Sequence, residues 1–141
     1  MALHRHAGTP ATVACAVALA GMAYCHIEDV GMKLDEHVYY MAGLFGANIA
    51  LSLALIPLIL ASDRLGPRRA AGAWAAAGGL AALTIACFIW SRTIGFPQMA
   101  DHIGRWDALG LASVGCEAAI VATSAWVLTA RPVPALEGGR A

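Results

Sequence analysis

VYYMAGLFGANIALSLALIPLILAS, residues 38–62, contains no acidic, basic or histidine side chain. A hydrocarbon core about 30 Å thick requires roughly 20 such residues in a helix. Three further stretches, at about 10–27, 70–90 and 108–130, are almost as free of charge, and 60% of the chain is hydrophobic. The sequence therefore predicts an all-α membrane protein, residues 1–141, with four transmembrane helices in a single up-down-up-down bundle.

The first of these stretches is the shortest, and it has a second interpretation. His4, Arg5 and His6 precede it, and a basic start before an apolar run also describes a secretory signal peptide. No clean cleavage site of small residues precedes the polar segment that follows, and Tyr24 before Cys25 does not fit a lipoprotein site. We therefore expect a retained helix.

Basic residues are distributed unevenly between the two ends of the predicted bundle. Short cytoplasmic loops of membrane proteins carry an excess of lysine and arginine. We therefore expect both termini to be cytoplasmic, and the loops 26–41 and 91–107 to be extracytoplasmic, in a bacterial cytoplasmic membrane. The formal net charge of zero implies no nucleic-acid partner. The cytoplasmic set would be Arg5, Arg64, Arg68, Arg69, Arg131 and Arg140, and the outer set Lys33, Arg92 and Arg105.

Helix 108–130 carries its polar side chains on one stripe. Gly110, Ser113, Glu117 and Ser124 recur at helical spacing, so this stripe should face the bundle rather than lipid. A carboxyl group within the membrane is costly unless it is paired, protonated or hydrated. Glu117 is therefore a candidate for handling a proton or anchoring a ligand.

A purely structural role for Glu117 is the alternative. In that case the carboxyl group would accept hydrogen bonds from Asn48, Thr84 or Ser91, or pair with Arg92. Asn48 and Ser52 lie one turn apart in the second stretch and could bond across helices. The two interpretations of Glu117 remain open at this stage.

Histidine, methionine and carboxylate side chains collect near the predicted outer face. Imidazole with thioether favours copper, and imidazole with carboxylate suits zinc or oxidised copper. No H-x-x-x-H, C-x-x-C or M-x-x-M motif defines a geometry, and methionine also fills gaps in helix packing. We expect copper first and zinc second, with these candidate ligands: His26, His37, His102, Met22, Met41 and Glu36.

The end of the third helix has a distinct motif. Gly95 and Pro97 follow Ser91-Arg92-Thr93, and they should end the helix sharply because glycine permits positive φ and proline cannot continue a helix. Arg92 could then contact an acidic loop residue. Cys25 and Cys87 fall near the outer face, where a disulfide could form, although buried free thiols are the expected state.

With Glu36-His37, Gly43 and Glu117, the segment Trp90–Pro97 resembles a family of small, functionally uncharacterised four-helix membrane proteins of high-GC bacteria. The family's S-R-T-x-G-x-P pattern stands here as Ser91-Arg92-Thr93-Ile94-Gly95-Phe96-Pro97. The resemblance covers most of the membrane region and implies the four-helix fold. It brings no established activity with it.

Nothing in the chain resembles a nucleophile triad, a phosphate-binding glycine loop or a dinucleotide site. Our first hypothesis is a non-catalytic accessory subunit of a larger, metal-dependent or redox membrane complex, whose outer loops dock the partner or help to load its metal. The second is a stand-alone protein that handles copper or zinc, as a carrier or small transporter. The third is a small membrane enzyme that uses Glu117 with His26 or His37.

The bias in basic residues predicts sidedness. A cysteine introduced near Lys33 should react with a membrane-impermeant thiol reagent in intact cells, because the 26–41 loop is expected outside. Labelling that appears only after the membrane is permeabilised would reverse the orientation.

Overall fold

The computed structural model describes residues 8–130, which fold into a bundle of helices. All four long helices are long and apolar enough to cross a membrane, which confirms the predicted all-helical class. The chain termini, with Arg5, Arg131 and Arg140, lie outside the described residues. The helices are α1 (Gly8–Asp35), α2 (Tyr39–Leu60), α3 (Pro67–Thr93) and α4 (Ala108–Thr129), with short 3-10 helices η1 (Ser62–Arg64) and η2 (Ala100–His102) in the connections.

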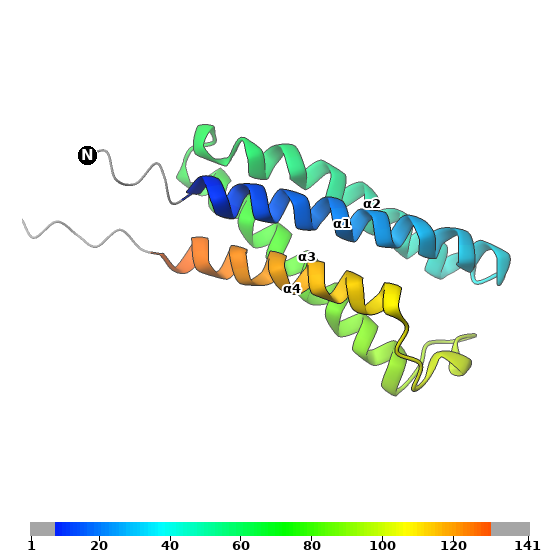
Figure 1. Cartoon of the computed structure of the whole chain (residues 1–141). Coiled ribbons are helices and arrows are strands. Elements are labelled where there is room, and N and C mark those ends of the chain that lie inside the picture. The colour runs from blue at the N-terminus through cyan, green and yellow to red at the C-terminus, as the bar shows by residue number, and fades with distance from the viewer. Residues whose placement is uncertain (1–7, 131–141) are drawn as a thin grey trace, which may run out of the picture.

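The helices are arranged as two pairs. Helix α1 packs along α2, and α3 packs along α4, while the main contact between the two pairs is that of α1 with α4. Helices α2 and α3 touch much less. The pairs diverge toward the end where α1 connects to α2 (Figure 1). That divergence leaves space between them, and the candidate site lies there.

Helix α1 extends well beyond the expected end near residue 27 and continues to Asp35. Hydropathy reports where a segment leaves the hydrocarbon, but it does not report where the helix stops. Glu28, Met32 and Lys33 are good helix formers, so the polar residues continue the same helix. Most of the expected loop 26–41 is therefore helical, and its side chains have fixed directions relative to the bundle.

His37 ends α1 in a left-handed turn. Its φ is 60°, its N–H donates to the Leu34 carbonyl at 3.1 Å, and the Val38 N–H donates to the Lys33 carbonyl at 2.9 Å. This pair of bonds is the Schellman arrangement, in which glycine or asparagine is usual at the left-handed position. Val38 is buried against Met41 directly after the turn. His37 thus has a clear local role in reversing the chain.

The junction between α3 and α4 depends on one carboxylate. Helix α3 ends at Thr93 and Gly95 adopts a φ of 90°, which confirms the predicted sharp end. Asp107 then caps α4, because its Oδ1 accepts from the Gly110 N–H at 2.7 Å. Its Oδ2 accepts from Arg92 at 2.5 Å, so the expected contact of Arg92 with an acidic loop residue is present.

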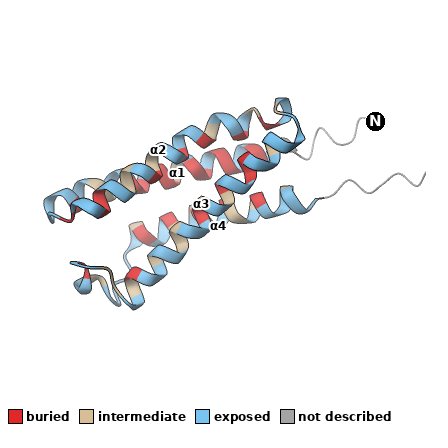
Figure 2. Ribbon diagram, turned by 180° about the vertical axis from the view of Figure 1, so that it is seen from behind, coloured by how far each residue is buried: buried red, intermediate tan, exposed pale blue. Residues whose placement is uncertain are grey.

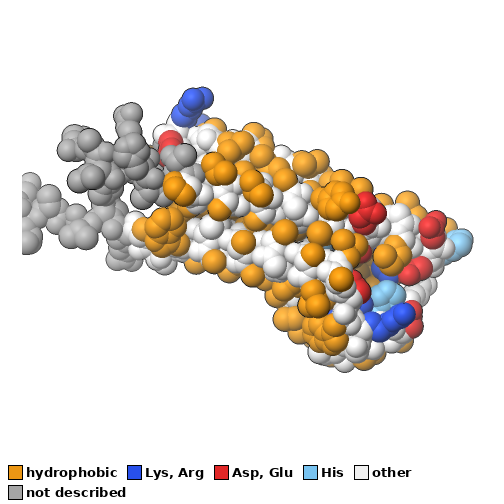
Figure 3. Space-filling model, viewed as in Figure 1, with side chains coloured by type: hydrophobic (Ala, Val, Ile, Leu, Met, Phe, Trp, Pro, Cys, Tyr) orange, Lys and Arg blue, Asp and Glu red, His pale blue; other side chains and the backbone are white. Residues whose placement is uncertain are grey.

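Buried residues follow the inner sides of the helices, and exposed ones cover the outside (Figure 2). The predicted stripe on α4 is confirmed, since Gly110, Ser113, Glu117 and Ser124 are all buried. In Figure 3 the body of the bundle is covered mainly by apolar side chains, and charged and histidine side chains gather at the end where the pairs diverge. Such a surface suits a lipid bilayer around the body.

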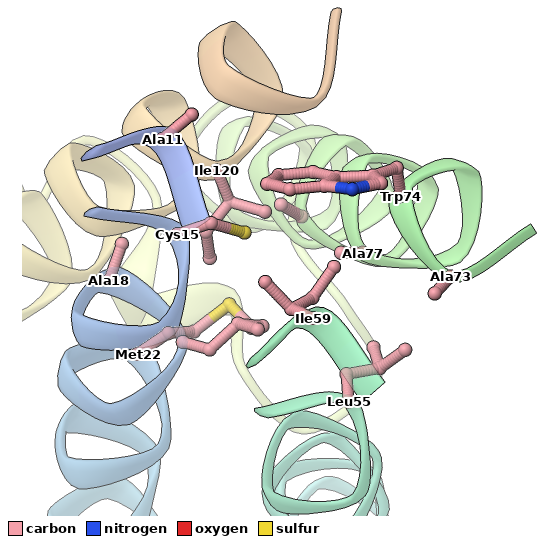
Figure 4. Packing of buried hydrophobic residues seen from close by; sticks show 12 residues of the cluster. Ala11, Cys15, Ala18, Met22, Leu55, Ile59, Ala73, Trp74, Ala77 and Ile120 are labelled. Atoms are coloured by element: carbon pink, nitrogen blue, oxygen red, sulfur yellow. The ribbon is translucent and has the colours of Figure 1, made fainter. Parts of the chain in front are cut away.

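The apolar core lies toward the opposite end of the bundle from these polar side chains. Cys15, Leu19 and Met22 of α1 are fully buried, and Ile59 of α2 and Ile120 of α4 meet them. Figure 4 shows Cys15, Met22, Ile59 and Ile120 converging with the Trp74 indole of α3, so that all four helices contribute. Fully burying such side chains stabilises a fold by roughly 1.5–3 kcal/mol each in water, although lipid as the reference reduces the gain. Met22 therefore belongs to the core.

Two neighbouring glycines of α3 test how closely α3 and α4 approach. A Cβ built on Gly78 would lie 2.9 Å from the Ser124 Cβ, whereas one on Gly79 would meet nothing within 4 Å. Gly78→Ala should lower the free energy of unfolding by about 1–3 kcal/mol through overpacking. Gly79→Ala is the matched control and should leave stability unchanged or raise it by up to about 1 kcal/mol. Unfolding in detergent followed by circular dichroism measures both, and equal stability of the two variants would contradict this packing.

Candidate functional site

A cavity of about 470 Å³ lies between the diverging helix pairs. All four long helices and the connection from α3 to α4 contribute to its wall. Small-molecule sites in proteins commonly occupy about 300–1,000 Å³, so this cavity has the size of a ligand site. Its apolar wall is formed mainly by Met41, Phe45, Phe88, Phe96 and Met99.

His26 and Glu117 form the buried polar centre of the cavity wall. His26 is 3% exposed and Glu117 is 1% exposed. The His26 Nε2 lies 3.8 Å from the Glu117 Oε1, and its Nδ1 lies 3.5 Å from the Asp29 Oδ2. Both distances are longer than a good hydrogen bond. The imidazole and the carboxylate therefore face each other without a hydrogen bond between them.

Neighbouring side chains hold this pair in place. The His26 ring stacks on Phe45 of α2, with centroids 5.0 Å apart and planes inclined by 22°. The Ser113 hydroxyl donates to the Glu117 Oε1 at 2.9 Å from one turn earlier on α4. Both His26 nitrogens and the Glu117 Oε2 are buried and lack a hydrogen-bond partner among the described residues. These three atoms are the free polar atoms of the His26–Glu117 pair.

The cations of the cavity, in contrast, already have partners. Lys33 is 3% exposed, and its Nζ donates to the Glu36 Oε2 at 2.5 Å and to the His102 Nε2 at 2.7 Å. Arg92 donates to Asp107 and lies over the Phe88 ring, with its Cζ 4.9 Å from the centroid. The Arg92 Nε alone is buried without a partner. Charge pairing thus accounts for both buried cations.

His102 connects Lys33 to the solvent-exposed edge of the cavity. Because its Nε2 accepts from Lys33, its Nδ1 is the protonated nitrogen and donates to the Asp101 Oδ1 at 3.1 Å. This hydrogen bond lowers the pKa of Asp101, and the positive charge of Arg105 acts in the same direction. The network joins the α3–α4 connection to the end of α1.

The histidines expected to share a metal ion are only partly brought together. His26 and His102 line the same cavity with Met41 and Met99. His37 is exposed at the turn after α1 and contacts the Tyr39 ring edge-on at 5.9 Å between centroids. Among the described residues, no three His, Cys, Asp or Glu side chains are placed to hold one metal ion. The copper or zinc site, with Met22, Met41 and Glu36 among its ligands, stays a prediction.

The structural partners that we expected for Glu117 were wrong. Asn48 donates to the Thr84 Oγ1 at 2.8 Å and so links α2 to α3, as expected of an interhelical bond. Arg92 is taken by Asp107, and Ser91 donates to the Phe88 carbonyl at 2.7 Å. Each of these groups has a nearer partner than Glu117. Cys25 and Cys87 are free thiols, and Cys25 is buried as expected, whereas Cys87 is exposed.

Two members of the site were missed from sequence. Asp29 and Lys33 follow His26 at intervals of three and seven residues, which places all three on one face of a helix. The spacing could have indicated that Asp29 and Lys33 lie beside His26, but only if residues 26–35 had been expected to be helical. The stack of Phe45 on His26 was also missed, because nothing in the spacing of Phe45 indicates it.

Comparisons with protein-family models, curated proteins and solved structures found no match to this chain. The resemblance carried by the segment Trp90–Pro97 therefore remains an expectation.

The His26–Glu117 pair can be tested by a double-mutant cycle. Glu117→Leu should lower the free energy of unfolding by about 1–3 kcal/mol, because the Ser113 hydroxyl loses its acceptor and the buried His26 imidazole loses the carboxyl group that faces it from α4. Replacing both partners, His26→Leu with Glu117→Leu, should recover at least half of that loss, since no unmatched polar group of the pair remains.

Glu28, exposed on the outer side of α1, provides the control. Glu28→Leu should change the free energy of unfolding by less than about 0.5 kcal/mol. Unfolding in detergent is measured for wild type, His26→Leu, Glu117→Leu, the double variant and Glu28→Leu. Additive effects of the His26 and Glu117 substitutions would show that the two side chains are not coupled.

Proposed function

We propose that this protein is a multi-pass membrane protein that binds a small ligand in the cavity between its helix pairs. One observation carries the proposal: His26 and Glu117 are buried in the cavity wall with polar atoms that no described residue satisfies. Most buried polar atoms in proteins have a partner, and exceptions call for an explanation. A ligand that bonds to these atoms is the explanation we favour.

The energetics support this choice. An unsatisfied polar group in an apolar setting costs about 1–3 kcal/mol in proteins, and a charged group costs more. Two such groups side by side in the wall of the cavity would be a persistent cost in the empty protein. A ligand with matching donors or acceptors removes the cost, so the same groups provide both affinity and orientation.

We place the cavity on the extracytoplasmic side of a bacterial cytoplasmic membrane, in an up-down-up-down bundle with cytoplasmic termini. Arg64, Arg68 and Arg69 lie in and beside the connection between α2 and α3, which the positive-inside rule assigns to the cytoplasm. The cavity lies at the connection between α1 and α2, so it would open toward the outside. Water-soluble ligands could then reach it without crossing the membrane.

A second candidate function is the non-catalytic accessory subunit of a larger membrane complex, metal-dependent or redox in nature. The outward face of α3 supports it, because Gly72 and Gly79 are exposed and have open space around them. Small residues on a helix surface permit close approach of another transmembrane helix. The polar end around His102 and Glu36 would then dock the partner or help to load its metal.

Purification in lipid nanodiscs tests the ligand proposal. Wild-type protein should carry a small molecule near one per chain, released by organic solvent and detected by mass spectrometry. The variant His26→Leu with Glu117→Leu should lose it, because the unsatisfied atoms are gone, while Glu28→Gln should retain it.

Two results of that preparation decide between the candidates. A species that is equally abundant in wild type and double variant is not bound at this site, and the ligand proposal then fails. A stoichiometric partner protein that both preparations retain would favour the accessory subunit.

A further inference from the structure

The charges around the cavity are unequally matched. Lys33 is neutralised by Glu36, and Arg92 by Asp107. Arg105, the third cation of the wall, is 69% exposed at its side chain and lies 3.8 Å from Asp101. Each cation therefore has a carboxylate of its own, and His102 is taken up by Lys33 and Asp101.

Two carboxylates of the wall have no lysine or arginine partner among residues 8–130. Glu117 and Asp29 share one imidazole, that of His26, at 3.8 and 3.5 Å. A single imidazole contributes at most one positive charge against these two groups. The buried centre of the cavity consequently lacks positive charge, and a cationic ligand would supply it.

The free atoms at this centre are suited to a hydrogen-bond donor. The Glu117 Oε2 can only accept when the carboxylate is ionised, and a neutral imidazole offers one acceptor nitrogen. An ammonium group carries three donors and no acceptor, in the way that a lysine side chain does. It could donate to the Glu117 Oε2 and to the acceptor nitrogen of His26 at once.

The remainder of the wall is apolar and aromatic. Phe45 lies beside His26, and Phe88 and Phe96 with Met41 and Met99 line the space beyond. Aromatic faces attract cations, and thioethers adapt to apolar bodies of irregular shape. The cavity therefore offers a polar centre for a charged head and an apolar volume for the group attached to it.

We propose that the cavity binds a primary amine attached to an aromatic or similarly bulky apolar body, with the ammonium group at Glu117, Asp29 and His26. This inference rests on the proposed ligand-binding function and names the chemical class of the ligand. The free Arg92 Nε and the N–H of the His26 imidazole would suit an anion, and the test includes an anion for that reason.

The test compares three probes with the same body and different heads: phenylbutylamine, phenylbutanol and phenylbutyrate. Full-length protein in phosphatidylcholine nanodiscs is titrated by calorimetry, and the heats with empty discs are subtracted to remove partitioning into lipid. The amine should bind at least about tenfold more tightly than the alcohol, because it adds charge-assisted hydrogen bonds. The acid should bind most weakly of the three.

Matched variants show whether the named groups are responsible. Glu117→Gln should weaken the amine at least about tenfold and leave the alcohol unchanged. Asp29→Asn should weaken the amine to a smaller degree, and it serves as the second variant if Glu117→Gln does not fold. Phe45→Ala should weaken all three probes, whereas Glu28→Gln on the outer side of α1 should alter none.

The outcomes distinguish failure of the amine assignment from failure of the proposed ligand binding in the cavity. If the alcohol or the acid binds as tightly as the amine, the amine assignment is overturned while ligand binding in the cavity stands. If the amine binds best but Glu117→Gln and Asp29→Asn leave its affinity unchanged, the assigned head-group site is overturned. If none of the probes binds, the amine assignment is overturned, and the co-purified small molecule alone decides whether the cavity binds a ligand.

Discussion

The contact between α1 and α4 holds the two helix pairs together, and the position of the site depends on it. Close to the core, Leu19 and Met22 of α1 pack in one cluster with Ile120 of α4, and a Cβ on Gly21 would lie 2.8 Å from the Cys116 sulfur. The two helices are therefore as near as their backbones and small side chains permit. One turn further along α1, the same approach brings His26 to Glu117. The core thus determines which polar groups meet.

Beyond that contact the helix pairs diverge, and polar side chains replace apolar packing there. Some of these polar groups have charged partners at hydrogen-bond distance, and others do not. Lys33 and Arg92 have carboxylate partners at hydrogen-bond distance, so their charges are largely neutralised where they lie. Glu117 receives only a serine hydroxyl and a distant imidazole. In a low-dielectric setting this difference matters more than in water, because each unmatched charge interacts strongly with whatever enters. The wall consequently selects by charge as well as by shape.

Much of the fold could be predicted from the chain, because membrane spans depend on local composition. The uncharged run at 38–62, and the glycine and proline after Arg92, are readable without tertiary information. Less of the site could be predicted from the sequence. His26 and Glu117 were both identified as candidates, but their meeting depends on the α1–α4 approach, which no local pattern encodes. His37 was taken for a ligand, although its left-handed backbone shows that it closes the Schellman turn after α1, and backbone conformation at a histidine cannot be inferred from its neighbours.

The unsatisfied pair also bears on how the empty protein behaves. Core packing around Trp74 and Ile59 lies away from the cavity, so the diverging end has fewer apolar contacts to hold it in one arrangement. Regions with few buried contacts open more readily than the core. The Asn48–Thr84 bond between α2 and α3 and the Lys33–His102 bond between α1 and the α3–α4 connection then act as the ties that limit how far the pairs can separate. A ligand bound between His26 and Glu117 would add a further tie across α1 and α4, so occupancy and closure of that end would stabilise each other.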